Sequence, residues 1–293
     1  MRRIPTFGLG RRSQGRRGRF RIWPLLLFGL FFLYYITVHR DTVPVSGRSQ
    51  LVDLSVQQEV ALGLSSYRNI LSQSEIVRAG GEVSRVREVG RRIAEVASRG
   101  ESGENTSSFK WEFNVIRSDQ ANAFALPGGK VGVNTGILPI AANDDGLAAI
   151  IGHEIAHAVA RHGAERMTHQ RLAQFGSMAM AMSVGEMDVQ TQRAVMAALG
   201  VGTQFGVLLP FSRKHESEAD FIGLRYLAEA CFDPQEAPKL WKRMQAAASS
   251  GQPLELLSTH PAPETRIRQF EEWMPEAMEI YRRNCSEGQK EER

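Results

Sequence analysis

The sequence predicts a mainly helical domain with a small β-sheet, which is the α+β fold class, preceded by one N-terminal transmembrane helix. Three observations lead to this prediction. Apolar residues recur at three- and four-residue steps in several long segments, which is the spacing of one helix face. Between residues 109 and 134 the period changes to two, which is typical of strands. An uncharged run from Ile22 to Val38 precedes these segments. With 293 residues, the chain has room for one substantial domain and short appendages.

The N-terminal segment differs in charge from the rest of the chain. Residues 1–40 hold nine Arg and no acidic residue, which leaves 27 basic against 32 acidic residues in 41–293. The basic balance of the whole chain therefore belongs to the N-terminus. The mildly acidic remainder gives no reason to expect nucleic acid as a partner.

Residues 1–21 and 22–38 together have the composition of a signal anchor. Seventeen uncharged residues are the short end of a membrane span, and the positive-inside rule places the Arg-rich residues 1–21 in the cytoplasm. We therefore expect a single transmembrane helix in a bacterial inner membrane, with the folded domain in the periplasm. A cleaved signal peptide and a mitochondrial presequence remain alternatives. The second of these would place the domain at the mitochondrial inner membrane.

The remaining boundaries follow from composition and periodicity. Residues 39–54 contain Pro and Gly and are expected to form a linker. The folded domain is expected from 55 to 275, and a polar tail from 276 to 293. Cys231 and Cys285 have no metal-type spacing, so a cysteine-based zinc site is not expected. Whether they form a disulfide stays open at this level, because pairing depends on the compartment.

The first half of the domain begins with two helices and a strand. Ser55 and Gln58 predict a capping box at the start of the first helix. Val and Ile residues from 83 to 96 form the apolar stripe of the second helix. Apolar and polar residues alternate from 109 to 115, which indicates a half-buried strand.

A hairpin is expected directly after this strand. Residues 122–126 are extended, 127–130 form a turn, and 131–134 return. Plain sheet structure would explain this pattern. Alternatively, the first strand is an edge with which an extended peptide pairs, and Gly132 leaves space for the peptide backbone. The candidate substrate-binding residues are Asn122, Ala123, Phe124 and Ala125.

The segment from Ala173 to Leu209 is rich in Ala, Gly and Met and is interrupted at residues 188–193. Neither half is a clean apolar run of 18 residues, so no further membrane span is expected. We expect a helical hairpin that lies over the core or the cleft.

The stretch from residue 144 to 162 carries a candidate metal site. His153 and His157 are four residues apart, so they lie on one helix face and can share one ion. Glu154 lies beside them, where it can take a proton from water. Asn143 is placed to cap this helix. A coincidental helix remains an alternative, but two His and one Glu among apolar residues are costly unless something pairs them.

A second helix offers a carboxylate for the same site. Glu216 and Asp220 are four residues apart and share a face. A catalytic zinc site uses three protein ligands and leaves the fourth position open. Glu216 is the candidate third ligand, and Asp220 is placed to hold the free ring nitrogen of a ligand His. A solvated charge run is the alternative, because Arg213 and Lys214 stand nearby.

These motifs together resemble the zinc metalloproteases of the HtpX and CAAX-prenyl-protease family. The matching segments are residues 122–129, 153–157, 216–220 and 259–261 with Arg266, and they occur in the family's order. The resemblance covers about residues 55–275. It implies a gluzincin-type fold with one Zn²⁺ per chain, bound by His153, His157 and Glu216 rather than Glu218.

The same resemblance gives Glu154 the role of catalytic base and adds His260 as a catalytic residue. His260 can donate to the oxyanion that forms when water attacks the peptide carbonyl. It can also occupy the fourth zinc position in the resting enzyme. Arg266 is expected to support the site or to orient His260. The other histidines, His162, His169 and His215, are expected at the surface.

The function that this resemblance implies is zinc-dependent endoproteolysis of misfolded or membrane-associated proteins in envelope quality control. The expected partners are unfolded or misassembled proteins and the membrane, which the N-terminal helix would contact. The alternative function is that of a zinc-stabilised holdase or assembly factor with latent protease activity. The oligomeric state stays open.

Overall fold

Helices make up most of the computed structural model, which describes residues 19–99, 106–204, 208–249, 256, 260 and 265–291. This agrees with the predicted mainly helical class with a small sheet. The helices are α1 (Trp23–Val38), α2 (Val56–Ser72), α3 (Gly81–Ala97), η2 (Thr135–Ile137), α5 (Leu138–Ala141), α6 (Asp144–Val159), α7 (His162–Val184), α8 (Val189–Thr203), α9 (Leu209–Glu229), α10 (Glu236–Ser249) and α12 (Thr265–Glu291). The strands are β1 (Arg40–Thr42), β2 (Ser49–Leu51), β3 (Ile76–Val77), β4 (Glu112–Ile116), β5 (Ala123–Leu126) and β6 (Lys130–Asn134).

The main sheet has the strand order β3-β4-β6-β5. β5 and β6 pair antiparallel, which confirms the predicted hairpin, while β4 and β6 pair parallel. β5 forms one edge, as expected. The space expected at Gly132 is filled by the side chain of Phe124, the residue that pairs with it on β5. A Cβ added to Gly132 would lie 2.3 Å from Cζ of Phe124, so the Phe124 ring covers Gly132, and the edge of β5 is what remains for pairing with a peptide.

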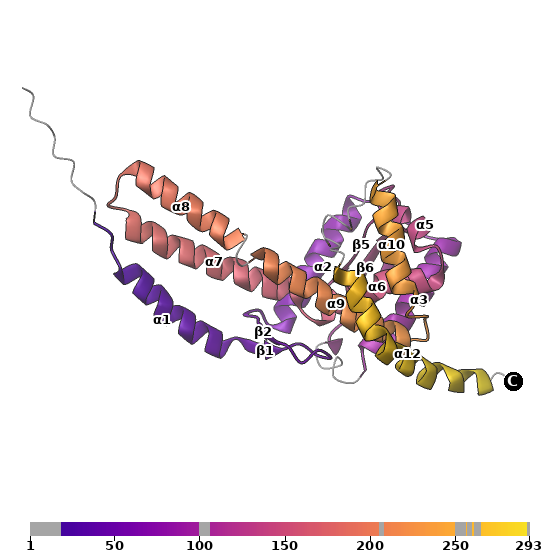
Figure 1. Cartoon of the computed structure of the whole chain (residues 1–293). Helices are drawn as coiled ribbons and strands as arrows, with labels where there is room; N and C mark the ends of the chain where they lie inside the picture. The colour runs from indigo at the N-terminus through magenta and orange to yellow at the C-terminus, as the bar shows by residue number, and fades with distance from the viewer. Residues whose placement is uncertain are drawn as a thin grey trace, which may run out of the picture.

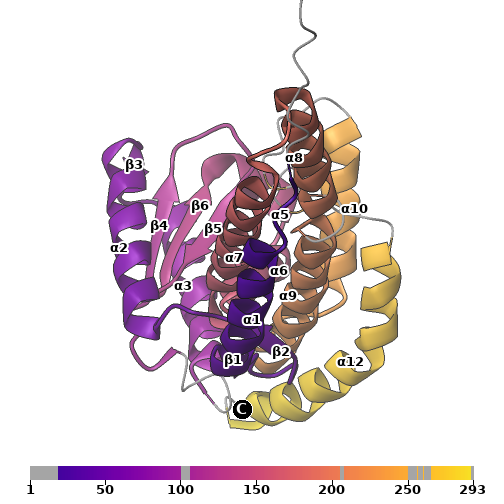
Figure 2. The same ribbon diagram turned by 90° about the vertical axis from the view of Figure 1, so that its left-hand side faces the viewer.

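The core surrounds α6, which is buried along almost its whole length. The Asn143 side chain accepts a hydrogen bond from the backbone N–H of Gly146 and caps the helix, as predicted. Glycine lets α9 approach α6 closely: a Cβ on Gly223 would lie only 3.1 Å from the backbone N of His153. Figure 2 shows the main sheet on one side of α6, and α9, α10 and α12 on the other.

Three helices, α1, α7 and α8, extend away from the sheet as a helical arm (Figure 1). Phe31 of α1 packs edge-on against Phe175 of α7, with 5.6 Å between ring centroids. At the far end of the arm, the backbone N–H of Arg21 donates to the carbonyl of Ser183 over 2.9 Å. α7 and α8 form the expected helical hairpin, but the expectation that it lies over the core or the cleft is wrong, because α7 packs along α1 and α8 packs on α7. Among the described helices, none is both long enough and apolar enough to cross a membrane.

Residues 40–51, within the segment expected as a linker, form a two-stranded hairpin of β1 and β2. Val43 in this hairpin is fully buried and belongs to the core. Arg161, at the junction of α6 and α7, donates to the carboxylates of Asp41 and Glu59 and to the Leu54 carbonyl. The hairpin is therefore packed and hydrogen-bonded onto the domain.

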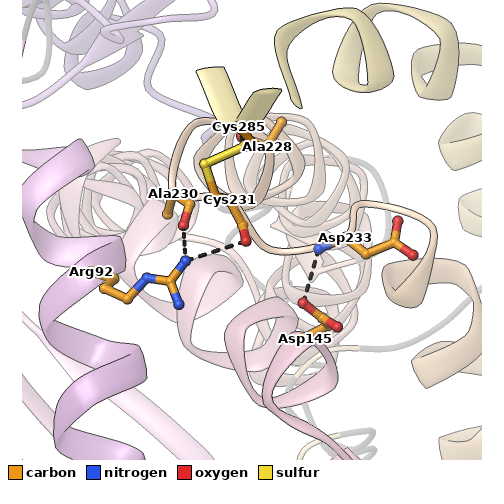
Figure 3. Close-up of a disulfide and its surroundings, with 7 residues drawn as sticks. All are labelled: Arg92, Asp145, Ala228, Ala230, Cys231, Asp233 and Cys285. Atoms are coloured by element: carbon orange, nitrogen blue, oxygen red, sulfur yellow. Dashed lines mark hydrogen bonds between the residues drawn. A yellow bond between two sulfur atoms is a disulfide. The ribbon is translucent and has the colours of Figure 1, made fainter. Parts of the chain in front are cut away.

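A disulfide joins Cys231 to Cys285 and so ties α12 to the end of α9 (Figure 3). The two residues are 54 positions apart in the sequence. The guanidinium of Arg92, on α3, donates to the carbonyls of Ala230 and Cys231 beside it. The cross-link thus closes a long loop, and its main effect is to restrict the unfolded chain.

Candidate metal centre

Two neighbouring helices supply three of the side chains that converge at the centre of the domain. His153 and His157 project from α6, and Glu216 projects from α9. The Nε2 atoms of the two histidines lie 3.1 Å apart. The carboxylate oxygens of Glu216 lie 3.4 Å from Nε2 of His153 and 3.5 Å from Nε2 of His157. The close approach of α9 at Gly223, two turns after Glu216, makes this convergence sterically feasible.

His260 completes this group from outside the two helices. Its Nδ1 lies 2.9 Å from Oε2 of Glu216 and 3.3 Å from Nε2 of His153. One ligand atom from each of the four residues lies within 4.8 Å of all the others. Ligands of a tetrahedral zinc ion are about 3.3 Å apart, given zinc–nitrogen bonds of about 2.05 Å. The residues present therefore fit a tetrahedral metal ion.

Glu154 is buried beside this group, with 4% of its surface exposed. Its Oε1 has no hydrogen-bond partner among the described residues, and Nε2 of His260 is 3.5 Å away. Burial raises the pKa of Glu154, although nearby His260 and His153 and a hydrogen bond from the Ala125 backbone act against this. A buried carboxylate with a raised pKa and an unpartnered oxygen is suited to accept and return a proton.

The charged groups around the histidines set their protonation. Burial lowers the pKa of His153, but hydrogen bonds to Asp220 and Glu216 outweigh it and raise the pKa to about 9. Burial lowers the pKa of His157 well below its usual value. Burial alone would raise the pKa of Glu216, but the neighbouring histidines hold it far below its usual range. The centre therefore contains an ionised Glu216 and a neutral His157, which are the forms that bind a metal ion. The carboxylates of Asp220 and Glu216 also favour a positive charge at His153.

Asp220 and Arg266 support the site from behind. Oδ1 of Asp220 lies 3.0 Å from Nδ1 of His153, on the side of the ring away from Glu216. Arg266 donates two hydrogen bonds to Asp220, of 2.5 and 2.6 Å, and its guanidinium lies 3.6 Å from the centroid of the Trp241 ring. Its Nη1 also lies 3.5 Å from Glu216. Arg266 thus holds Asp220 by hydrogen bonds and places a positive charge beside Glu216.

The predicted substrate-binding residues lie on or next to β5, which runs beside α6. Ala123 is buried, whereas Phe124 and Ala125 are half-buried. Asn122 precedes the strand, and its carbonyl accepts from the backbone N–H of Asn134. Ala125 connects the strand to the site, because its backbone faces the Glu154 carboxylate and acts to lower the pKa of that group. The structure therefore brings this edge strand and the metal centre together.

The expectation that His162 and His215 lie at the surface is wrong. They are only 3% and 5% exposed, and His169 is half-buried. His162 reaches the metal centre, with its Nδ1 2.8 Å from Nδ1 of His157. The chain turns between α6 and α7 at Arg161, whose φ of 59° is left-handed. No local sequence pattern predicts such a turn at an Arg, so helical periodicity alone could not place His162 beside His157.

Two histidines on one helix, a glutamate between them and a carboxylate from a second helix define a metal-dependent hydrolase. Residues 83–274 match the model of peptidase family M48. The chain belongs to this family and is a metallopeptidase, which confirms the resemblance drawn from its motifs.

Named relatives come from mitochondria and from bacteria. The chain is similar to the mitochondrial metalloendopeptidase OMA1 of Schizosaccharomyces pombe, with 41% identity over 84% of this chain and 69% of the relative. It is 38% identical to the OMA1 protein of Saccharomyces cerevisiae over 89% of this chain and 76% of the relative. It is also 31% identical to the β-barrel assembly-enhancing protease of Escherichia coli, over 78% of this chain and 46% of the relative.

Proposed function

We propose that this metallopeptidase is a zinc-dependent endopeptidase that cleaves misfolded or membrane-associated proteins in envelope quality control. The observation that carries the proposal is the convergence of His153, His157 and Glu216 with the buried carboxylate of Glu154 beside them. The activities for which the relatives are named, those of a mitochondrial metalloendopeptidase and an assembly-enhancing protease, support this proposal.

In this proposal, His153, His157 and Glu216 hold one Zn²⁺. Bound zinc acts as a Lewis acid that polarises a carbonyl and makes water a nucleophile near neutral pH. Glu154 takes the proton of the attacking water and returns it to the amine that leaves. The β5 edge aligns the peptide backbone by strand pairing, so the scissile bond reaches Glu154 next to Ala125.

His260 has two roles in this scheme, and they require two positions of its ring. In the described conformation its Nδ1 lies among the ligand atoms, which supports the role of a fourth ligand that keeps the resting site closed. A ring that has moved away from Glu216 can donate a hydrogen bond to the oxyanion of the reacting carbonyl. Its neighbours Thr259, Pro261 and Pro263 lie outside the described residues.

The proposed zinc chemistry is tested by removing and restoring the metal. We expect dialysis against a zinc chelator to abolish cleavage of an unfolded protein such as casein. One equivalent of Zn²⁺ should restore cleavage, whereas Mg²⁺ should not, because Mg²⁺ prefers octahedral oxygen ligands. The measurements are metal content by elemental analysis and the rate of peptide release. Full cleavage by a chain shown to contain no metal would contradict the proposal.

We also propose that the protein works at a membrane, attached through α1. The apolar side chains of Leu26, Leu27, Leu30 and Leu33 are 58–68% exposed along this helix. Such a surface is costly in water and favourable against lipid. The disulfide supports an oxidising compartment, such as the periplasm or its mitochondrial counterpart. A bacterial inner membrane and a mitochondrial inner membrane remain the two candidate locations.

The membrane proposal is tested by flotation with phospholipid vesicles. We expect the full chain to float with the vesicles and the double variant Leu26→Asp/Leu30→Asp to stay in solution. Each Asp costs about 3 kcal/mol near the centre of a membrane helix. The matched control is Leu62→Asp, which changes a leucine of α2 that is 49% exposed and should not alter flotation. Equal flotation of all three proteins would contradict membrane attachment through α1.

A second candidate function is a zinc-stabilised holdase or assembly factor with latent protease activity. The position of His260 among the ligand atoms favours it, because a permanently bound His260 would exclude water from the metal. The two functions differ in what the protein does without Glu154.

A further inference from the structure

A buried polar cluster lies on the far side of His157 from the metal centre. Its members come from three parts of the chain, and most of them are almost completely buried: Glu165 is 0% exposed, His162 3% and Glu218 8%. The proposed chemistry at Glu154 uses none of them. The cluster consists of Ser46 and Arg48 of the β1–β2 hairpin, His162 and Glu165 of α7, and His215 and Glu218 of α9.

The first link of this cluster touches a proposed metal ligand. Nε2 of His157 faces Glu216 and is the nitrogen available to the metal. A neutral His157 that binds metal through Nε2 must carry its proton on Nδ1. That Nδ1 lies 2.8 Å from Nδ1 of His162, so His162 must accept the hydrogen bond there.

The second link gives this chain of hydrogen bonds a single direction. Because Nδ1 of His162 is an acceptor, its proton is on Nε2. Nε2 of His162 lies 2.9 Å from Oε2 of Glu218, a carboxylate that can only accept when ionised. Every donor therefore meets an acceptor from His157 through His162 to Glu218. His153 has the shorter equivalent, since its Nδ1 faces Asp220 directly at 3.0 Å.

The carboxylate at the end of the chain is held by the β1–β2 hairpin. Nε of Arg48 donates to Oε2 of Glu218 over 2.8 Å, and the Ser46 hydroxyl donates to Oε1. The remaining nitrogens of Arg48 donate to Glu165 over 2.9 and 2.7 Å. Glu165 also pairs with Nε2 of His215, 2.9 Å away, and the His215 ring stacks on His162 with 4.2 Å between centroids.

We propose that His162 and Glu218 are positioning residues that orient the metal ligand His157, and that Arg48 extends this support to the β1–β2 hairpin. The inference rests on the proposed metal centre and adds to it. Partners that orient ligand histidines typically change metal affinity by about 10- to 100-fold when they are removed. In this proposal, the β1–β2 hairpin that directly follows α1 helps to orient a ligand of the metal site.

The test compares zinc affinity, measured by competition with a chelating dye, in three variants. His162→Phe keeps a ring but removes the acceptor, and should weaken zinc binding about 10- to 100-fold. His162→Asn places an amide oxygen near the position of Nδ1 and should recover part of this loss. His39→Phe is the matched control, since it makes the same substitution at a half-buried histidine that packs on Tyr35 and is not a member of the cluster; its zinc affinity should equal that of the unmodified chain.

Two further measurements separate positioning from general damage. The visible spectrum of the Co²⁺-substituted protein reports ligand geometry, and it should change in His162→Phe but not in His39→Phe. Arg48→Gln, which breaks the link to the hairpin, should weaken zinc binding in the same direction. If the His162→Phe chain does not fold, the folded His162→Asn variant carries the comparison through its Co²⁺ spectrum and its affinity.

Unchanged zinc affinity and an unchanged Co²⁺ spectrum in the folded His162 variants would overturn this inference while leaving the metal centre intact. An unmodified chain that binds no zinc would instead overturn the proposed metal centre, and with it this inference.

Discussion

Replacing Glu154 with Gln is expected to reduce peptide-bond cleavage by at least about 10²- to 10⁴-fold while the protein keeps its zinc. Loss of a positioned general acid–base group has an effect of this size. The substitution is nearly isosteric, and Glu154 is buried next to the ligand group without belonging to it. An amide cannot accept the proton of the attacking water, so peptide-bond cleavage should stop. Zinc binding should survive, because the new side chain has nearly the same shape. The measurements are casein cleavage rate and zinc content.

Glu82→Gln provides the matched control, because it makes the same substitution at an exposed position of α3 and should cleave at the normal rate. Cleavage by Glu154→Gln at the rate of the unmodified chain would refute the role of Glu154. The same variant separates the two proposed functions. If Glu154→Gln still suppresses aggregation of an unfolded protein and supports growth under envelope stress, the holdase function is favoured over proteolysis.

Replacing Arg266 with Met is expected to lower the free energy of unfolding by about 3–5 kcal/mol. Arg266 and Asp220 are 2% and 3% exposed and form a pair with two hydrogen bonds. Removing one partner of a buried ion pair leaves the other as an uncompensated charge, and this is what makes the change costly. Met keeps most of the apolar stem that packs on Trp241. Urea unfolding of the metal-free protein measures the effect.

A double variant distinguishes the lost charge balance from lost packing. Arg266→Met/Asp220→Asn removes both charges and should recover much of the stability lost in Arg266→Met. Arg91→Met provides the control, because Arg91 forms only exposed ion pairs with Glu88 and Glu95 and should leave the unfolding midpoint unchanged. A double variant no more stable than Arg266→Met would show that packing, rather than the uncompensated Asp220 charge, explains the loss.

Local patterns in the sequence were sufficient for several parts of the fold and of the candidate site. The four-residue spacing of His153 and His157 places both rings on one face of α6, because one helical turn takes 3.6 residues. The Asn143 cap and the Ser55–Gln58 capping box formed as predicted, since each depends on residues only three apart. The turn residues at 127–130 likewise located the β5–β6 hairpin. All of these features are decided by near neighbours in the chain.

Features that depend on distant residues were decided by the tertiary structure. The disulfide between Cys231 and Cys285, the packing of α7 along α1, and the Phe124 ring over Gly132 all result from packing that no periodicity encodes. The same holds for the partner of Arg266. The fold places Arg266 on Asp220, 46 residues earlier in the chain.

The metal centre shows both kinds of determination in one place. The sequence by itself determined the helix that carries His153, Glu154 and His157, because side-chain direction along a helix follows from spacing. Only the tertiary structure decided what surrounds that helix. The glycine contact between α6 and α9 brings Glu216 to the histidines, and the left-handed turn at Arg161 brings His162 behind His157. Both depend on backbone approach and backbone conformation, which the identities of neighbouring residues do not specify.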